Sequence, residues 1–105
     1  MTNYIREGLK TLPGHWHQGG WRNGAGDQCG GGHVRSVIAK EFGEHTEFFR
    51  SMDLVFKIMG EVAYEQFPER AEVASFFRFN DHPDTTEAEV IAVMEKAALL
   101  LDETL

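Results

Sequence analysis

The chain has 105 residues, of which 42% are hydrophobic, including eight Phe and two Trp. This length predicts a single domain over residues 1–105 that can bury a hydrophobic core. The formal net charge of −7 lies in the second half, where residues 51–105 carry four Lys or Arg against twelve Asp or Glu. Such a field repels phosphate and argues against direct nucleic-acid binding, whereas an acidic face can meet a basic protein surface or simply keep the protein soluble.

The sequence also bears on the compartment in which the protein works. No segment approaches the roughly 18 consecutive apolar residues of a membrane span, and the N-terminus lacks the basic start and apolar run of a signal peptide. The single cysteine, Cys29, cannot form an internal disulfide and gives no sign of an oxidising compartment. We therefore expect a cytoplasmic protein without a membrane partner.

A short helix is predicted near the N-terminus, with Thr2 as its N-cap and Pro13-Gly14 as its end. Its apolar residues recur on one helical face: Ile5, Leu9 and Leu12. Residues 14–32 hold eight glycines and both tryptophans. Because this density disfavours regular helix, we predict an irregular loop or short hairpin that is held in place by its large rings.

Two longer helices are expected next. The first starts just after Gly32 and ends at Gly43, its C-terminal cap. The second runs from about Thr46, its N-cap, to about Gln66. Its apolar stripe is wide and comprises Phe48, Phe49, Met52, Val55, Phe56, Met59, Val62 and Ala63. Gly60 within this helix costs roughly 1 kcal/mol relative to Ala, which predicts a close approach of another backbone segment or a bend.

The segment after Gln66 is less regular. Phe67-Pro68 is expected to end the long helix, because proline disfavours helical geometry at the residue before it. Residues 69–72 then form one short turn. Residues 75–79 are predicted to pack as extended or helical chain rather than as sheet, because no second convincing strand can pair with them. The three rings of Phe76, Phe77 and Phe79 are interpreted as core rather than as a ligand cage.

A turn followed by a capped amphipathic helix closes the chain. Asn80-Asp81 is predicted to form the turn, with side chains that hydrogen-bond nearby backbone N–H groups. Two residues can cap the helix, each completing a capping box: Asp84 with Glu87, or Thr86 with Glu89. The chain is therefore predicted to be mainly α, a small orthogonal bundle of about four helices with a glycine- and tryptophan-rich irregular loop or short hairpin between helices 1 and 2.

The two longest helices carry more apolar surface than one stripe requires. Leu54 and Ile58 fall outside the stripe of the long helix, and Leu99 and Leu105 extend that of the last helix. We interpret these four residues as a candidate interface with a protein partner, and self-association is the simplest way to cover them.

Several segments together form a recognisable pattern. They are Trp16-His17-Gln18-Gly19, Cys29-Gly30-Gly31-Gly32 at the start of a helix, Phe79-Asn80-Asp81, Thr86, Glu89-Val90, Met94 and Ala97. In this pattern the chain resembles a domain-of-unknown-function family of small proteins from actinobacteria and their phages. The resemblance implies such a source, which for a phage protein makes a host protein the natural partner. It implies nothing catalytic, because the family has no assigned activity.

Four residues suggest a metal site. His15, His17, Cys29 and His33 lie within 19 residues of one another, and imidazole and thiolate ligands suit tetrahedral Zn²⁺. A metal would also order the glycine-rich segment. The spacing matches no common zinc module, so ordinary polar histidines and a small buried thiol are the competing interpretation.

Cys29 is alternatively a candidate nucleophile of a Cys-dependent hydrolase. A thiolate just before a helix N-terminus is favoured by the helix dipole. Partners for such a site are at hand: Gln18 or Gln28 for an oxyanion, His17, His33 or His82 as base, and Asn80 or Asp81 to orient it. A phosphate cradle at Gly30-Gly31-Gly32 lacks the other residues of a P-loop.

Buried structural cysteines are more common than catalytic ones. The sequence therefore favours a small non-enzymatic protein without a cofactor, apart from the zinc alternative, that acts by binding a protein partner through a helical face.

Overall fold

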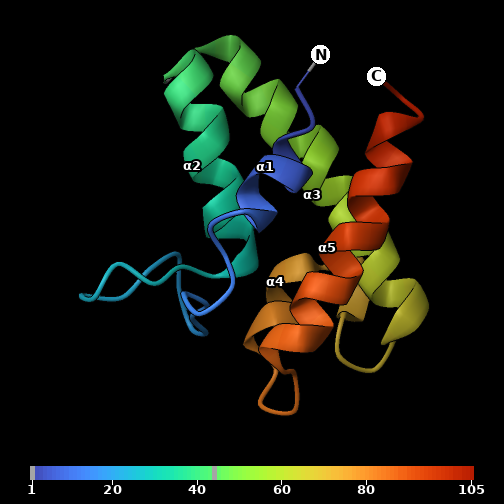
Figure 1. The fold of residues 1–105 in the computed structure, drawn as a ribbon. Coiled ribbons are helices and arrows are strands. Elements are labelled where there is room, and N and C mark those ends of the chain that lie inside the picture. The colour runs from blue at the N-terminus through green and yellow to red at the C-terminus, as the bar shows by residue number, and fades with distance from the viewer. Residues whose placement is uncertain (1, 44) are drawn as a thin grey trace.

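The computed structural model describes residues 2–43 and 45–105, and these residues form five α-helices and one 3₁₀ turn (Figure 1). In chain order they are α1 (Tyr4–Leu9), α2 (Gly30–Phe42), α3 (Thr46–Gln66), the 3₁₀ turn η1 (Glu72–Ala74), α4 (Phe76–Asp81) and α5 (Glu87–Asp102). The mainly helical prediction is confirmed. The described residues form five α-helices rather than about four, because residues 75–79, for which the sequence allowed extended or helical chain, contribute most of α4.

The core lies between the long helices. α1 packs on α2 and α5, and α3 packs on α2, α4 and α5. Figure 1 shows the chain between α1 and α2 extending to one side of these helices. Large, fully buried side chains come from every helix and from the segment just after α1: Ile5, Leu12, Ile38, Val55, Met59, Phe76, Phe79, Met94 and Leu101. Among the described residues, no helix combines the length and apolar character needed to cross a membrane.

Asn3, not Thr2, caps α1. Its side-chain oxygen accepts from the Arg6 N–H at 3.0 Å, and its Nδ2 donates to the Ala98 carbonyl at 2.7 Å. The prediction that Thr2 caps this helix is wrong, because the cap is Asn3, whose side chain also reaches α5. Asn3 therefore caps one helix and fixes it against another.

An ion pair joins the same two helices, since both guanidinium nitrogens of Arg6 donate to the carboxylate of Asp102, at 3.0 and 2.6 Å. The Arg6 hydrogen bond, aided by one from Asn3, lowers the pKa of Asp102 from 3.8 to about 2.

We expect this pair to contribute stability only where Asp102 is ionised. A lowered pKa in the folded state means that the contribution is present above pH 3.8 and is lost as the pH falls toward about 2. Urea unfolding across this interval should therefore show a smaller acid-induced loss in Asp102→Asn than in wild type. Glu103→Gln, the neighbouring exposed carboxylate, serves as the control, and equal acid sensitivity of Asp102→Asn and wild type would contradict the assignment.

α2 starts at Gly30 rather than after Gly32. Cys29 is its N-cap, with extended backbone and a sulfur that accepts from the Gly32 N–H at 3.1 Å. A Cβ on Gly30 would lie 2.8 Å from a ring carbon of Phe76, and a Cβ on Gly32 would lie 2.6 Å from the Trp21 carbonyl oxygen. The glycines of this first turn are thus explained by close packing. The predicted end of α2 at Gly43 is confirmed.

α3 begins at Thr46, but its N-cap is His45, which makes no side-chain capping bond. The prediction that Thr46 caps this helix is therefore wrong, since Thr46 already belongs to the first turn. Its end at Gln66 agrees with the sequence. The predicted close approach at Gly60 is confirmed, because a Cβ there would overlap the carbonyl oxygen of Ala74.

α4 and α5 each have a local side-chain cap. Ser75 caps α4 by accepting from the Arg78 N–H at 3.3 Å. Of the two caps that the sequence allows for α5, the structure uses Thr86, which forms a complete capping box with Glu89. Asp84 lies before this helix, and its N–H donates to Nδ1 of His82 at 3.1 Å.

Candidate functional site

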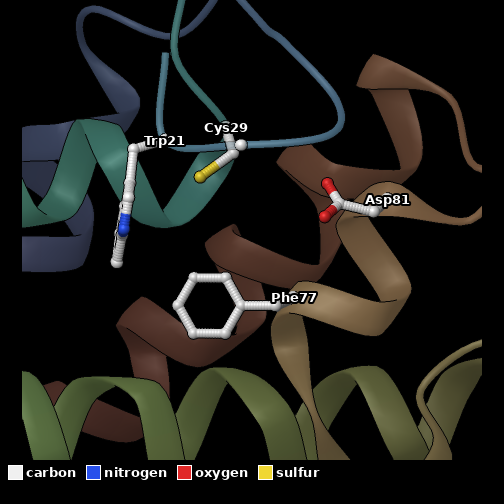
Figure 2. Close-up of a pocket in the computed structure, with 5 residues that line it drawn as sticks. Trp21, Cys29, Phe77 and Asp81 are labelled. Carbon is white, nitrogen blue, oxygen red and sulfur yellow. The ribbon is translucent and has the colours of Figure 1, made fainter.

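A surface cavity of about 260 Å³ lies between the glycine-rich segment and α4. It is lined by Gly20, Trp21, Cys29, Phe77 and Asp81. Figure 2 shows Trp21 and Asp81 on opposite sides of the cavity, with Phe77 between them and the Asp81 carboxylate pointing toward the space between these residues. We refer to this cavity as the aromatic pocket.

The aromatic walls of this pocket support one another. The Trp21 ring meets Phe77 edge to face, with centroids 5.1 Å apart, and Phe77 stacks on Phe56 of α3 at 5.0 Å. The guanidinium of Arg35 in α2 lies 5.2 Å from the centroid of the Trp21 ring. Trp21 and Phe77 nevertheless remain 41% and 39% exposed. Two large rings are thus fixed in place without being covered.

Asn80 connects the glycine-rich segment to α4. It is fully buried, and its Oδ1 accepts from the indole N–H of Trp16 at 2.7 Å and from the Gly30 N–H at 3.0 Å. Its Nδ2 donates to the His17 carbonyl at 3.1 Å and to Oδ1 of Asp81 at 2.9 Å. Asn80 and Asp81 lie in the last turn of α4, not in a separate turn as predicted. Their side chains hydrogen-bond to the glycine-rich segment rather than to the start of α5.

Asp81 and Gln18 complete this connection. Oδ1 of Asp81 also accepts from the Gly19 N–H at 2.9 Å. Nε2 of Gln18 donates to the carbonyls of Asn80 and His82, at 3.0 and 2.8 Å. The Trp16-His17-Gln18-Gly19 segment is therefore bound along its whole length to the end of α4, and it holds the pocket wall that follows it.

The four predicted metal ligands have different contacts, although His15 and His33 line one cavity. In the described part of the chain, no group of three or more His, Cys, Asp or Glu side chains is placed to hold a metal ion. His33 is buried, with Nδ1 2.8 Å from Thr11 Oγ1 and Nε2 3.0 Å from the His15 carbonyl. Because a carbonyl only accepts, Nε2 carries the proton of the neutral ring.

The remaining candidates have other contacts as well. Nδ1 of His15 lies 3.2 Å from the Asp27 carboxylate, and the backbone N–H of His17, not its imidazole, donates to the Gln28 carbonyl at 2.9 Å. The Cys29 sulfur accepts the capping hydrogen bond from the Gly32 N–H. Zinc binding by these residues stays a prediction.

Cys29 is only 2% exposed, and burial raises the pKa of its thiol. The Gly32 N–H opposes this shift but is the smaller effect. The thiol lies at a helix N-terminus, as predicted. Its desolvation by burial depends on the folded structure, and it favours the neutral thiol over the nucleophilic thiolate.

The candidate interface residues differ in accessibility. Leu54, Leu99 and Leu105 are exposed, with Leu99 at 63%. Ile58 is half-buried and packs against the core. The interpretation of the three phenylalanines as core holds for Phe76 and Phe79 but not for Phe77, which lines the pocket. The sequence could not separate Phe77 from the other two, because Phe76 and Phe79 share a face only in a helix, and the sequence left helix and extended chain open for this segment.

Comparison with known proteins places the chain in a family. Comparisons with curated proteins and with solved structures give no match. The model of a family described as a family of unknown function, DUF6197, matches residues 4–100. This range includes all the residues that line the aromatic pocket and nearly the whole helical core, so the chain belongs to the family of unknown function DUF6197.

Proposed function

We propose that this chain is a non-enzymatic protein that acts by binding a partner protein at the aromatic pocket. The observation that carries this proposal is the pair of half-exposed rings, Trp21 and Phe77, at the rim of a cavity. Exposed aromatic side chains that flank a pocket are typical anchors of protein interfaces. The exposed Leu99 of α5 also lines a cavity of about 260 Å³, but the residues that line it with Leu99 are Arg6, Leu9, Glu95 and Ala98, none of which is aromatic.

The rigidity of the pocket supports the same role. Trp21 is held by its carbonyl, which accepts from the Cys29 N–H at 3.1 Å, and by its contacts with Phe56, Phe77 and Arg35. A preformed aromatic surface loses little conformational entropy on binding, which leaves more of the contact free energy for affinity.

The source and compartment complete this proposal. The resemblance to actinobacterial and phage proteins supports a bacterial or phage origin, and a host protein as partner in the second case. A lone buried thiol at Cys29 is compatible with a reducing compartment, and we place the interaction in the cytoplasm.

Affinity capture from a lysate of the encoding organism tests the proposal. We expect a specific protein to be retained by wild type and lost with Trp21→Ser and Phe77→Ser, with folding of each variant checked by circular dichroism. Phe49→Ser is the matched control, because Phe49 is an exposed aromatic residue outside the pocket, at 59%. Retention of the same proteins by wild type and both pocket variants would contradict the proposal.

A hydrolase using Cys29 makes a different prediction. Because burial raises the pKa of this thiol, we expect alkylation by iodoacetamide at pH 6.5 to be at least tenfold slower than that of a free cysteine peptide, since only the thiolate reacts. Unfolding in urea should restore the rate. Rapid alkylation of the folded protein would instead favour the nucleophile.

Two further proposals concern metal and self-association. A zinc-stabilised module would contain one metal per chain by elemental analysis, and protein that stays folded without metal in a chelator would exclude it. Self-association through Leu54, Leu99 and Leu105 would give a concentration-dependent mass in sedimentation that Leu99→Ser reduces.

A further inference from the structure

We propose that the aromatic pocket binds the ammonium group of a lysine side chain on the partner protein. This inference rests on the proposed function and specifies the chemistry of the partner. Three features of the pocket carry it: aromatic walls, one carboxylate with a fixed orientation, and a volume suited to a single side chain.

The aromatic walls favour a cation. The faces of Trp and Phe rings carry negative charge density, and a cation within about 6 Å of the ring centroid is stabilised. Trp21 already holds one cation in this way, because the guanidinium of Arg35 lies 5.2 Å from its centroid. Arg35 is not among the described residues that line the pocket. Its guanidinium therefore does not fill the cavity, and a second cation can enter there.

The carboxylate of Asp81 supplies the charged partner. The hydrogen bonds that the described residues make to it, from Gly19 and Asn80, both fall on Oδ1. These bonds hold the carboxylate pointing into the space between the lining residues (Figure 2) and leave Oδ2 as an acceptor for an incoming N–H group. A charge-assisted hydrogen bond to such an oxygen is stronger than a neutral one. The net charge of −7 attracts the same cation at longer range.

An anionic group fits this place poorly, although the pocket lies at the N-terminus of α2. The Gly30 N–H donates to Asn80 and the Gly32 N–H donates to the Cys29 sulfur. Two of the donors that would hold a phosphate or carboxylate at a helix N-terminus are therefore already used.

The pocket has room for a single side chain. Its volume of about 260 Å³ lies near the lower end of the about 300–1,000 Å³ that sites for small molecules measure, so its walls rather than its size favour lysine. A lysine has a flexible four-carbon stem that matches the rings and the Cys29 wall, and a compact head with three donors that matches one carboxylate. The planar fork of arginine instead favours a bidentate acceptor, and Oδ1 of Asp81 is already hydrogen-bonded.

An NMR titration of the full ¹⁵N-labelled chain tests the inference. The probes are N-acetyl-lysine methylamide and its uncharged analogue N-acetyl-norleucine methylamide. We expect the lysine probe to shift the indole resonance of Trp21 and the amide of Asp81 in a saturable way. The norleucine probe should bind at least tenfold more weakly, which corresponds to about 1.4 kcal/mol. Equal binding of the two probes, or no saturable binding of the lysine probe, would overturn the proposal.

Two variants separate the carboxylate from general charge. Asp81→Asn should weaken the lysine probe on the order of tenfold, since it removes one charge-assisted contact. Asp84→Asn removes the same charge outside the pocket and should change affinity less than twofold. Phe77→Leu, which keeps the carboxylate and removes a ring, should also weaken binding if the walls contribute. Equal effects of the two Asp variants would overturn the site.

The outcomes also distinguish this inference from the proposed function. A partner captured through Trp21 and Phe77, combined with no preference for the lysine probe, would overturn the lysine assignment and leave the binding role intact. Lysine binding without any partner lost from the pocket variants would contradict the binding role instead.

Discussion

Replacing Gly60 by Ala should lower the free energy of unfolding by about 2–3 kcal/mol, although alanine is the better helix former by about 1 kcal/mol. A methyl group at this buried position of α3 would overlap the carbonyl oxygen of Ala74. That oxygen belongs to backbone, so a side-chain rotation cannot relieve the overlap. α3 and η1 would have to separate, which would also disturb the contact of α3 with α4.

Urea unfolding of Gly60→Ala and of Glu61→Ala measures this effect. Glu61 is the next residue of the same helix and is exposed, so its substitution should change stability by less than about 0.5 kcal/mol. An increase in the stability of Gly60→Ala would mean that helix propensity outweighs the overlap, and would contradict the close approach.

The backbone opposite Gly60 has an unusual conformation. Val73 and Ala74 have φ values of 54° and 55°, in the left-handed region that β-branched residues rarely adopt. This conformation turns the chain so that the Ala74 carbonyl reaches α3 and α4 can begin at Phe76. The sequence predicted a close approach at Gly60 but did not identify the Ala74 carbonyl as its partner. Neither Val73 nor Ala74 is a residue type that normally indicates a left-handed turn.

The sequence predicted well what depends on local periodicity. The range of α3 agrees with the prediction, although its N-cap does not, and the capping box of α5 is one of the two that the sequence allowed, because these signals lie within a few residues. The cap of α1 could not, because Asn3 is held in part by Ala98, 95 residues away. α4 has only six residues, which is too short for a periodic pattern to separate helix from extended chain.

The candidate site could be predicted even less. Cys29 was placed correctly at a helix N-terminus, but the pocket depends on Trp21 and Phe77, which are brought together by contacts across the chain. The Asn80-Asp81 pair drew attention as a local turn. Its actual partners are Trp16, His17 and Gly19, more than 60 residues earlier, and no spacing rule relates such distant residues.

Asn80→Ala should lower the free energy of unfolding by about 3–5 kcal/mol, more than any other single substitution among the polar residues that join the glycine-rich segment to α4. The change would leave the indole N–H of Trp16 and the N–H of Gly30 without the acceptor they share, and the His17 carbonyl without its donor. Asn80 is fully buried, so water cannot replace these bonds without opening the structure. Each buried group left without a partner costs about 1–3 kcal/mol.

Chemical denaturation followed by tryptophan fluorescence measures the loss, with Asn23→Ala as the control. Asn23 lies in the same glycine-rich segment, but its contacts are exposed and local, so its loss should cost less than about 1 kcal/mol. Hydrogen exchange of the Gly30 amide gives a second readout, because its protection depends on Asn80. If that amide stays protected in Asn80→Ala, the glycine-rich segment is held by the rings around Trp21, and Asn80 is not what fixes the pocket wall.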